Sequence, residues 1–177
     1  MKKYNLLYKI KRKFLIKFLN SFFCGTNFFR FKTILLNHSG IECHPSAKIV
    51  GPFEIGTITD VSIGRDCWIG ANIKFYGNGS VKIGDRCDIA PEVAFLTGSH
   101  EILNTKEKNI QRIAGKGIQY TIVVDDGCWI GARSSITGNT SIERFSIIGS
   151  MSFVNKSIPQ YSIVGGIPAK QLKKRNQ

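Results

Sequence analysis

The feature that most constrains the fold is an aliphatic residue at every sixth position in the second half of the chain. The register is unbroken over six residues: Val124, Ile130, Ile136, Ile142, Ile148 and Val154. This spacing matches neither the period of about 3.6 residues of an amphipathic helix nor the two-residue alternation of a half-buried strand. It predicts a triangular solenoid in which each six-residue strand forms one side and points its first residue inward.

A second layer of order, with a period of twenty, lies upstream. The residues that repeat are Ile49 with Ile69 and Ile89, Ile55 with Phe75 and Phe95, and Cys43 with Ile63 and Ile83. Three hexads need eighteen residues, so each of these coils carries two more, at one corner. His100 closes the third hexad of the next coil, and residues 101–123 follow there. We therefore expect residues 101–123 to be a loop that protrudes from one edge of the solenoid, not a linker between domains.

Small residues occupy the fifth position of many hexads: Cys67, Cys87, Cys128, Ser134, Thr140, Ser146 and Ser152. Such side chains suit a tight, inward-facing place near a corner. The alternative is a metal or disulfide role for the cysteines, but stacked inward thiols would have to distort the coil to bond. We therefore predict packed small residues that are too far inside to act as nucleophiles.

The positive charge is concentrated at the N-terminus. The formal net charge is +13, and residues 1–32 hold nine basic residues and no acidic one. Residues 4–23 predict a helix with Leu7, Phe14, Phe18 and Phe22 on one face and Lys9, Lys13 and Lys17 on another. Two alternatives stay open: the apolar face packs on the solenoid end or on a neighbouring subunit, or the helix lies on an anionic membrane.

Cellular location follows from what the N-terminal segment lacks. Lysines interrupt its apolar residues, unlike in a signal peptide, and the uncharged run at residues 18–29 is shorter than the ~20 residues of a spanning helix. Five cysteines without a C-x-x-C pair fit reduced thiols. We expect a cytoplasmic protein, with a peripheral contact on the inner face of the cytoplasmic membrane as an extension. Nucleic acid is not an expected partner, because RNA-binding motifs are missing.

Three segments carry a family resemblance: "IGDRCDIAPEVAFLTGSH", "DDGCWIGARSSITGNTSI" and "SIPQYSIVGGIPAK". Together with the hexads they resemble the hexapeptide-repeat acyltransferases, and more narrowly the maltose/galactoside/Nod-factor O-acetyltransferases and their polysaccharide-modifying relatives. The likeness spans about residues 41–174. It implies a mainly β fold, a left-handed parallel β-helix, assembled as a homotrimer. It also implies that acetyl-CoA lies in a groove between adjacent solenoids, with the long loop of one subunit helping to wall the neighbour's active site.

The resemblance assigns the catalytic and acceptor roles. His100 stands at the family's catalytic histidine, and an imidazole with an ordinary pKa of about 6.5 suits a general base near neutral pH. Asn72 matches an asparagine that positions the acceptor or the base. Asn78 stands at a place that is often aspartate, so a carboxylate contact to a sugar hydroxyl would be missing here.

The resemblance also assigns the residues that would bind the acyl donor. Trp129 matches a residue lining the groove, and Ala132 offers backbone groups to the pantetheine arm. Lys156, Lys170 and Lys173 match basic positions that meet the phosphates of CoA. No metal is expected.

We therefore expect an acetyl-CoA-dependent O-acetyltransferase that acts by direct transfer on a saccharide hydroxyl, in particular of a cell-surface polysaccharide precursor. The alternatives are an N-acetyltransferase of a nucleotide-linked amino sugar, an O-acetyltransferase of antibiotics or other xenobiotics, and a basic membrane-surface scaffold without catalysis. A zinc enzyme on the same solenoid would need three histidine ligands, and the regular coils offer only His44 and His100.

The predicted organisation is a basic helical segment (1–40), the β-helix (41–165, with loop 101–123) and a basic tail (166–177).

Overall fold

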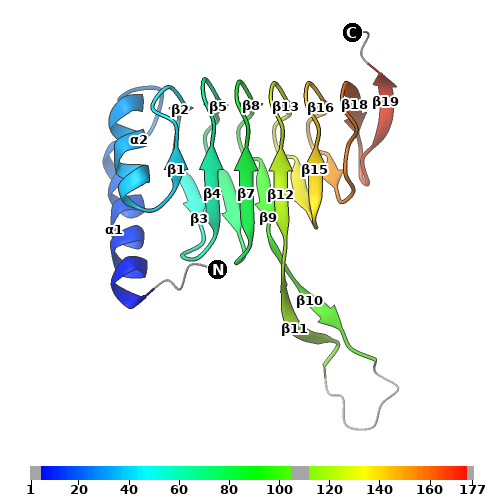
Figure 1. The fold of residues 1–177 in the computed structure, drawn as a ribbon, viewed down its shortest axis with the longest axis horizontal. Coiled ribbons are helices and arrows are strands. Elements are labelled where there is room, and N and C mark those ends of the chain that lie inside the picture. Colours follow the sequence, from blue (N-terminus) through cyan, green and yellow to red (C-terminus); the bar gives the residue numbers. More distant parts are fainter. Residues whose placement is uncertain (1–4, 105–111, 175–177) are drawn as a thin grey trace.

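The computed structural model describes residues 5–104 and 112–174. The parts of the predicted N-terminal segment, loop and tail at residues 1–4, 105–111 and 175–177 lie outside the described residues. Three sheets, parallel except for the last strand of one of them, wind as a three-sided solenoid; two helices cover its first coil, and one hairpin projects from it (Figure 1).

Each sheet takes one strand from successive coils. Sheet A contains β1 (Glu42–Cys43), β4 (Asp60–Ile63), β7 (Ser80–Ile83), β12 (Thr121–Val124) and β15 (Thr140–Ile142). Sheet B contains β2 (Lys48–Ile49), β5 (Trp68–Ile69), β8 (Asp88–Ile89), β13 (Trp129–Ile130), β16 (Ile147–Ile148), β18 (Ser162–Gly165) and β19 (Lys170–Lys174). Sheet C contains β3 (Phe53–Ile55), β6 (Ile73–Tyr76), β9 (Ala94–Leu96), β14 (Ser135–Thr137) and β17 (Phe153–Val154).

The period of twenty is the register of neighbouring strands. Ile49 pairs with Ile69 and Ile69 with Ile89, and the other two predicted series pair in the same way. The aliphatics at every sixth position from residue 124 to 154 are all at most 1% exposed. Fully burying one such side chain contributes about 1.5–3 kcal/mol. The predicted inward row is therefore confirmed, and it forms the core.

The small residues at the fifth position are buried as predicted, each at most 2% exposed. They satisfy the carbonyl groups of the neighbouring coil: the Ser134 hydroxyl donates to the Gly149 oxygen (2.9 Å) and the Cys87 thiol to the Asp125 oxygen (3.1 Å). Burial raises the pKa of the Cys128 thiol to about 11. A thiol that stays protonated inside the coil is a packing residue, not a nucleophile.

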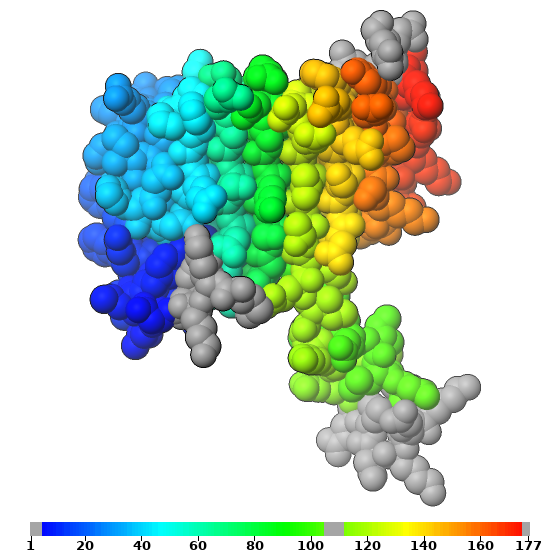
Figure 2. Space-filling model, in the orientation of Figure 1, coloured from blue at the N-terminus to red at the C-terminus, as the bar shows by residue number. Residues whose placement is uncertain are grey.

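Helix α1 (Leu6–Phe22) and helix α2 (Phe29–His38) cover the first coil (Figures 1 and 2). The buried residues of α1 are Arg12, Ile16 and Leu19. The face expected to be buried is instead exposed, with Leu7 at 74% and Phe14 at 67%. Of the alternatives for this face, packing on the chain's own solenoid is therefore wrong, whereas a neighbouring subunit and a membrane stay open. The face of α1 that does pack includes a buried arginine, so a count of apolar residues does not find it.

Helix α2 contributes a buried cation to the same end. Lys32 is 1% exposed, and its ammonium donates to the backbone oxygens of Ile49 (3.0 Å) and Val50 (2.9 Å) as well as to that of Gly25. Burial lowers the pKa of Lys32. This lysine ties α2 to the turn after β2, so it belongs to the fold rather than to a solvated basic surface.

The opposite end of the solenoid is closed by a strand. Strand β19 runs antiparallel along β18, although the sequence predicted only a basic tail beyond residue 165. Covering an open sheet edge in this way protects its unpaired backbone groups. Neither helix within residues 5–104 and 112–174 is long and apolar enough to cross a bilayer.

Candidate active site at the hairpin corner

The hairpin formed by β10 (Gly98–Ile102) and β11 (Ala114–Gln119) leaves the corner between sheets C and A. The chain departs at Thr97 and returns at Tyr120, whose backbone nitrogen donates to the Thr97 oxygen (2.8 Å). The protrusion thus begins at Gly98, three residues before the predicted loop. His100 therefore lies in the stem of the hairpin, not on the coil.

The hydrogen bond of His100 fixes its tautomer. Its Nδ1 lies 3.0 Å from the backbone oxygen of Gly115 on the opposite strand. A carbonyl oxygen only accepts, so Nδ1 carries the proton and the neutral ring keeps its lone pair on Nε2. The side chain is exposed. The arrangement gives an oriented imidazole whose free nitrogen can accept a proton from a bound hydroxyl.

His100 is one of the residues that line a pocket of about 310 Å³. Its lining residues come from the corner and both hairpin strands: Gly77, Asn78, Gly98, Ser99, His100, Gly117, Ile118 and Gln119. Glycine is required at Gly77, where φ is +98° and a Cβ would stand 2.6 Å from the Gly98 nitrogen. The absence of side chains lets the stem lie close to the coil and leaves backbone groups facing the pocket.

The corner itself is held by Thr97, which the sequence did not single out. Its hydroxyl donates to the Tyr76 oxygen (2.8 Å) and accepts from the Gly79 nitrogen (3.1 Å). Gly115, the acceptor for His100, was also missed. Gly115 is recognised as the partner of His100 only from the antiparallel pairing of β10 with β11. The six-residue periodicity of the sequence does not predict that pairing.

The structure brings Asn78 and Lys156 to the corner of His100. Asn78 shares the pocket, and Lys156 follows β17 at the same corner, two coils further along sheet C. Asn72 precedes β6 and so lies at the other end of the sheet C strands. Asn72 has a left-handed φ of 57°, a conformation that asparagine tolerates better than most residues. The backbone alone therefore explains why an asparagine stands here.

The predicted donor-binding residues other than Lys156 gather on or beside sheet B. Trp129 pairs with Ile147, Ile147 with Ile163, and Ile163 with Lys173, which places them in one outward-facing row. Trp129 is 53% exposed. Lys170 lies on β19, and Ala132 follows β13 at the corner with sheet C. Sheet B is the side of the triangle opposite the corner between C and A, so one chain keeps this group apart from His100.

No metal centre is formed by the part of the chain that the structure describes. Within residues 5–104 and 112–174, no three histidine, cysteine, aspartate or glutamate side chains are placed to hold an ion.

Similar proteins match the chain by sequence, although no family model matches it. Galactoside O-acetyltransferase of Escherichia coli (strain K12) is 28% identical over 118 residues, which are 67% of this chain and 56% of that protein. A chloramphenicol acetyltransferase of Morganella morganii is 31% identical over 138 residues, 78% of this chain and 60% of that protein. The chain thus spans less than two thirds of the length of these relatives. The putative colanic acid biosynthesis acetyltransferase WcaF of Escherichia coli is 24% identical, with 83% and 76% covered.

Solved structures match over nearly the whole chain. The hexapeptide-repeat-containing acetyltransferase VCA0836 from Vibrio cholerae superposes with a TM-score of 0.79 at 25% identity, covering 97% of this chain and 92% of that one. A galactoside acetyltransferase gives a TM-score of 0.76 at 21% identity, with 99% and 86% covered. The predicted fold class, a left-handed parallel β-helix of the acetyltransferase type, is confirmed. In sequence and fold, the predicted resemblance to the hexapeptide-repeat acetyltransferases is confirmed.

Proposed function

We propose that this chain is an acetyl-CoA-dependent O-acetyltransferase that acts on a saccharide hydroxyl, with His100 as general base. The observation that carries the proposal is the hydrogen bond from Nδ1 to the Gly115 oxygen (3.0 Å), which leaves Nε2 free. As the acceptor oxygen attacks the thioester carbon, Nε2 takes the hydroxyl proton. The C–S bond then breaks, and the imidazolium returns the proton to the departing thiolate. No acyl-enzyme forms, in keeping with the burial of Cys43, Cys87 and Cys128, which raises the pKa of each of these thiols.

Acetyl-CoA is proposed as the donor because relatives bind it. A structure of VCA0836 from Vibrio cholerae is complexed with acetyl coenzyme A, and the galactoside acetyltransferase structure with coenzyme A. On this chain, Trp129 and Ala132 would contact the pantetheine arm. Lys170 and Lys173, which take part in none of the ion pairs of the described residues, would meet the phosphates together with Lys156.

A homotrimer is part of the proposal, because His100 and the Trp129 row lie on opposite sides of one solenoid. A complete site then takes His100 from one subunit and Trp129 from its neighbour, and the hairpin helps to wall the neighbour's site. Asn72, remote from its own chain's His100, would approach the acceptor across the same interface.

Mixing two inactive variants tests shared sites. His100→Ala and Trp129→Ala chains are co-expressed, purified as mixed assemblies and assayed. Each mixed trimer would hold one intact site of three, so the purified mixed trimers should regain about a third of wild-type activity. No recovery in confirmed mixed assemblies would show that each site belongs to one chain, and monomeric mass in light scattering would exclude the trimer.

The acceptor is proposed to be a cell-surface polysaccharide precursor, a class suggested by the WcaF relative and by the polysialic-acid-specific acetyltransferase NeuO among the matched structures. Chloramphenicol acetyltransferases among the relatives make antibiotic acetylation the second candidate. Release of free thiol from acetyl-CoA decides between them when glycolipid extracts, simple sugars and chloramphenicol are compared. His100→Ala is expected to lower the stimulated rate by about a hundredfold or more, and an unchanged rate would remove His100 from the mechanism.

A peripheral membrane contact through residues 1–32, on the cytoplasmic side, completes the proposal. Within the described residues 5–32, α1 exposes Leu7, Ile10, Phe14 and Phe22, and lysines flank that face. A helix with an apolar face and basic borders is suited to an anionic lipid surface.

A further inference from the structure

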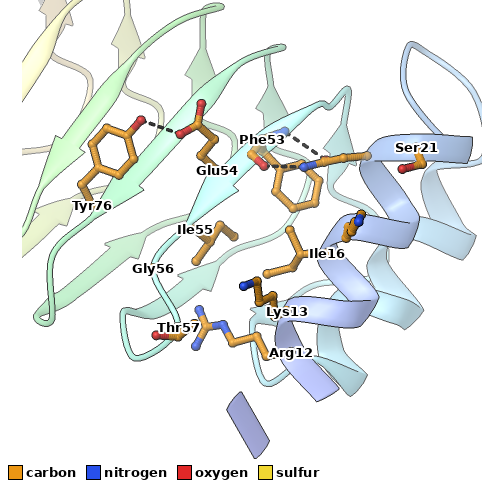
Figure 3. A pocket seen from close by; sticks show the side chains of 12 residues that line it. Arg12, Lys13, Ile16, Ser21, Phe53, Glu54, Ile55, Gly56, Thr57 and Tyr76 are labelled. Carbon is orange, nitrogen blue, oxygen red and sulfur yellow. Dashed lines mark hydrogen bonds between the residues drawn. The ribbon is translucent and has the colours of Figure 1, made fainter. Parts of the chain in front are cut away.

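A second pocket, of about 510 Å³, lies between α1 and the first two coils (Figure 3). Its lining comes from α1, from β3 and the turn after it, and from the end of β6. Ile16, Phe53 and Ile55 supply apolar walls. The Asn20 side chain donates to the Phe53 oxygen (2.7 Å) and accepts from the Phe53 nitrogen (3.1 Å), which fixes the helix against the strand. The pocket is therefore built into the fold.

Three cations line this pocket: Arg12, Lys13 and Lys17. Figure 3 shows Arg12 and Lys13 directed from α1 toward the strand and turn that carry Ile55 and Thr57. None of the three takes part in an ion pair of the described residues. Arg12 is 1% exposed, donates to the Thr59 oxygen (2.7 Å), and has an Nε without a hydrogen-bond partner among the described residues. A buried cation without a carboxylate leaves uncompensated positive charge beside the cavity.

The single carboxylate of the lining, Glu54, is engaged elsewhere. It accepts a hydrogen bond from the Tyr76 hydroxyl (2.5 Å) and lies 3.9 Å from the Lys74 ammonium. The hydrogen bond to Glu54 raises the pKa of Tyr76, so the phenol stays neutral. With Glu54 balanced by Lys74, the pocket keeps a net positive charge above an apolar floor.

This pocket and the pocket at His100 are lined by consecutive residues of one corner. Tyr76 lines the pocket beside α1, and the next two residues, Gly77 and Asn78, line the pocket at His100. Parallel strands of neighbouring coils lie about 4.8 Å apart, so β3 and β9 of sheet C are separated by about 10 Å. The hairpin that carries His100 begins two residues after β9, so an acceptor that spans both pockets must extend over at least this strand spacing.

We propose that the pocket between α1 and β3 binds a phosphate ester carried by the acceptor, which makes the acceptor a glycosyl phosphate rather than a neutral sugar. Lys13 and Lys17 contact the phosphate, Arg12 adds its charge from behind, and the apolar floor takes the carbon skeleton attached to it. The phosphate can belong to a soluble sugar phosphate or to a lipid-linked saccharide. The inference rests on the proposed acetyl transfer at His100.

Calorimetric titration of the full-length protein tests the pocket with two matched pairs, glucose 1-phosphate against glucose and geranyl phosphate against geraniol. Wild type is expected to bind at least one phosphate about tenfold more tightly than its neutral partner. A preference confined to geranyl phosphate identifies a lipid source, and one confined to glucose 1-phosphate identifies a soluble source. The proposal is overturned if neither phosphate is preferred.

Matched lysine variants locate the effect. Lys13→Gln/Lys17→Gln should abolish the phosphate preference, whereas Lys9→Gln/Lys11→Gln, with equal charge loss on the same helix outside the pocket, should keep it. A preference retained by the first variant, or a change in its assembled mass that marks the pocket as a subunit contact, would contradict the proposal. Acetyl-CoA is titrated separately. Loss of acetyl-CoA binding would count against the proposed acetyltransferase activity, whereas loss of the phosphate preference alone would count against this pocket.

Discussion

The two ends of the solenoid are closed by different means. At the first coil, Lys32 and Arg12 insert into the interior and donate to backbone oxygens of Ile49, Val50 and Thr59. At the last coil, β19 simply adds an antiparallel strand, and all its side chains are exposed. The comparison teaches that the backbone groups at the end of a solenoid can be hydrogen-bonded either by buried cationic side chains or by an added strand. With buried cations, the stability of that end depends on single side chains.

Replacing Lys32 by Met should cause the largest loss of stability. The change removes three donors and leaves one buried and two partly buried backbone oxygens without that partner, at about 1–3 kcal/mol for a fully buried unsatisfied group. We expect a loss of about 3 kcal/mol in urea unfolding. Lys48→Met, at an exposed position on β2, is the control and should change stability by less than about 0.5 kcal/mol. Equal effects would show that Lys32 does not hold this end together.

Arg12→Met should cost about 2 kcal/mol, because it orphans the Thr59 oxygen while the methionine still fills most of the space. Arg12→Lys, which keeps a charge and a donor, should recover part of the loss. Thermal unfolding of the three proteins measures both values. A stable Arg12→Met protein would mean that the arginine is retained for binding and not for the fold.

Ending the chain at residue 169 should have a smaller effect, about 1 kcal/mol, because the lost strand buries no side chain and contributes mainly hydrogen bonds along β18. The uncovered edge should instead promote self-association. Urea unfolding gives the first quantity and light scattering the second. A loss as large as that of Lys32→Met would remove the distinction between the two ends.

Phe14→Asp should leave stability almost unchanged, because the side chain is 67% exposed. It should weaken co-sedimentation with vesicles containing phosphatidylglycerol by about tenfold. Met151→Asp, at a comparably exposed site near the other end, is the control. If wild type ignores anionic and neutral vesicles alike, the outward face of α1 serves another purpose, such as subunit contact.

The strand register and the buried positions of the coil could be predicted because each six-residue side packs the same kinds of residue inward. The series through Ile69 gave the strand register, and the hexad positions of Cys67 and Cys128 gave their burial. The cap could not be predicted in this way, since Arg12 and Lys32 are buried only because backbone oxygens of distant residues meet them. The partner of His100 depends on how two strands of one hairpin align, which a six-residue period does not encode.

The row that runs outward across sheet B from Trp129 to Lys173 has a consequence for how such chains can change. Its length is set in whole strands of about 4.8 Å. Gaining or losing one coil between β13 and β19 would shift the terminal lysines by a full step relative to the tryptophan. The number of coils thus sets the distance between the tryptophan and the lysines in steps of one strand. Elongated ligands that bind both must match one of these discrete distances.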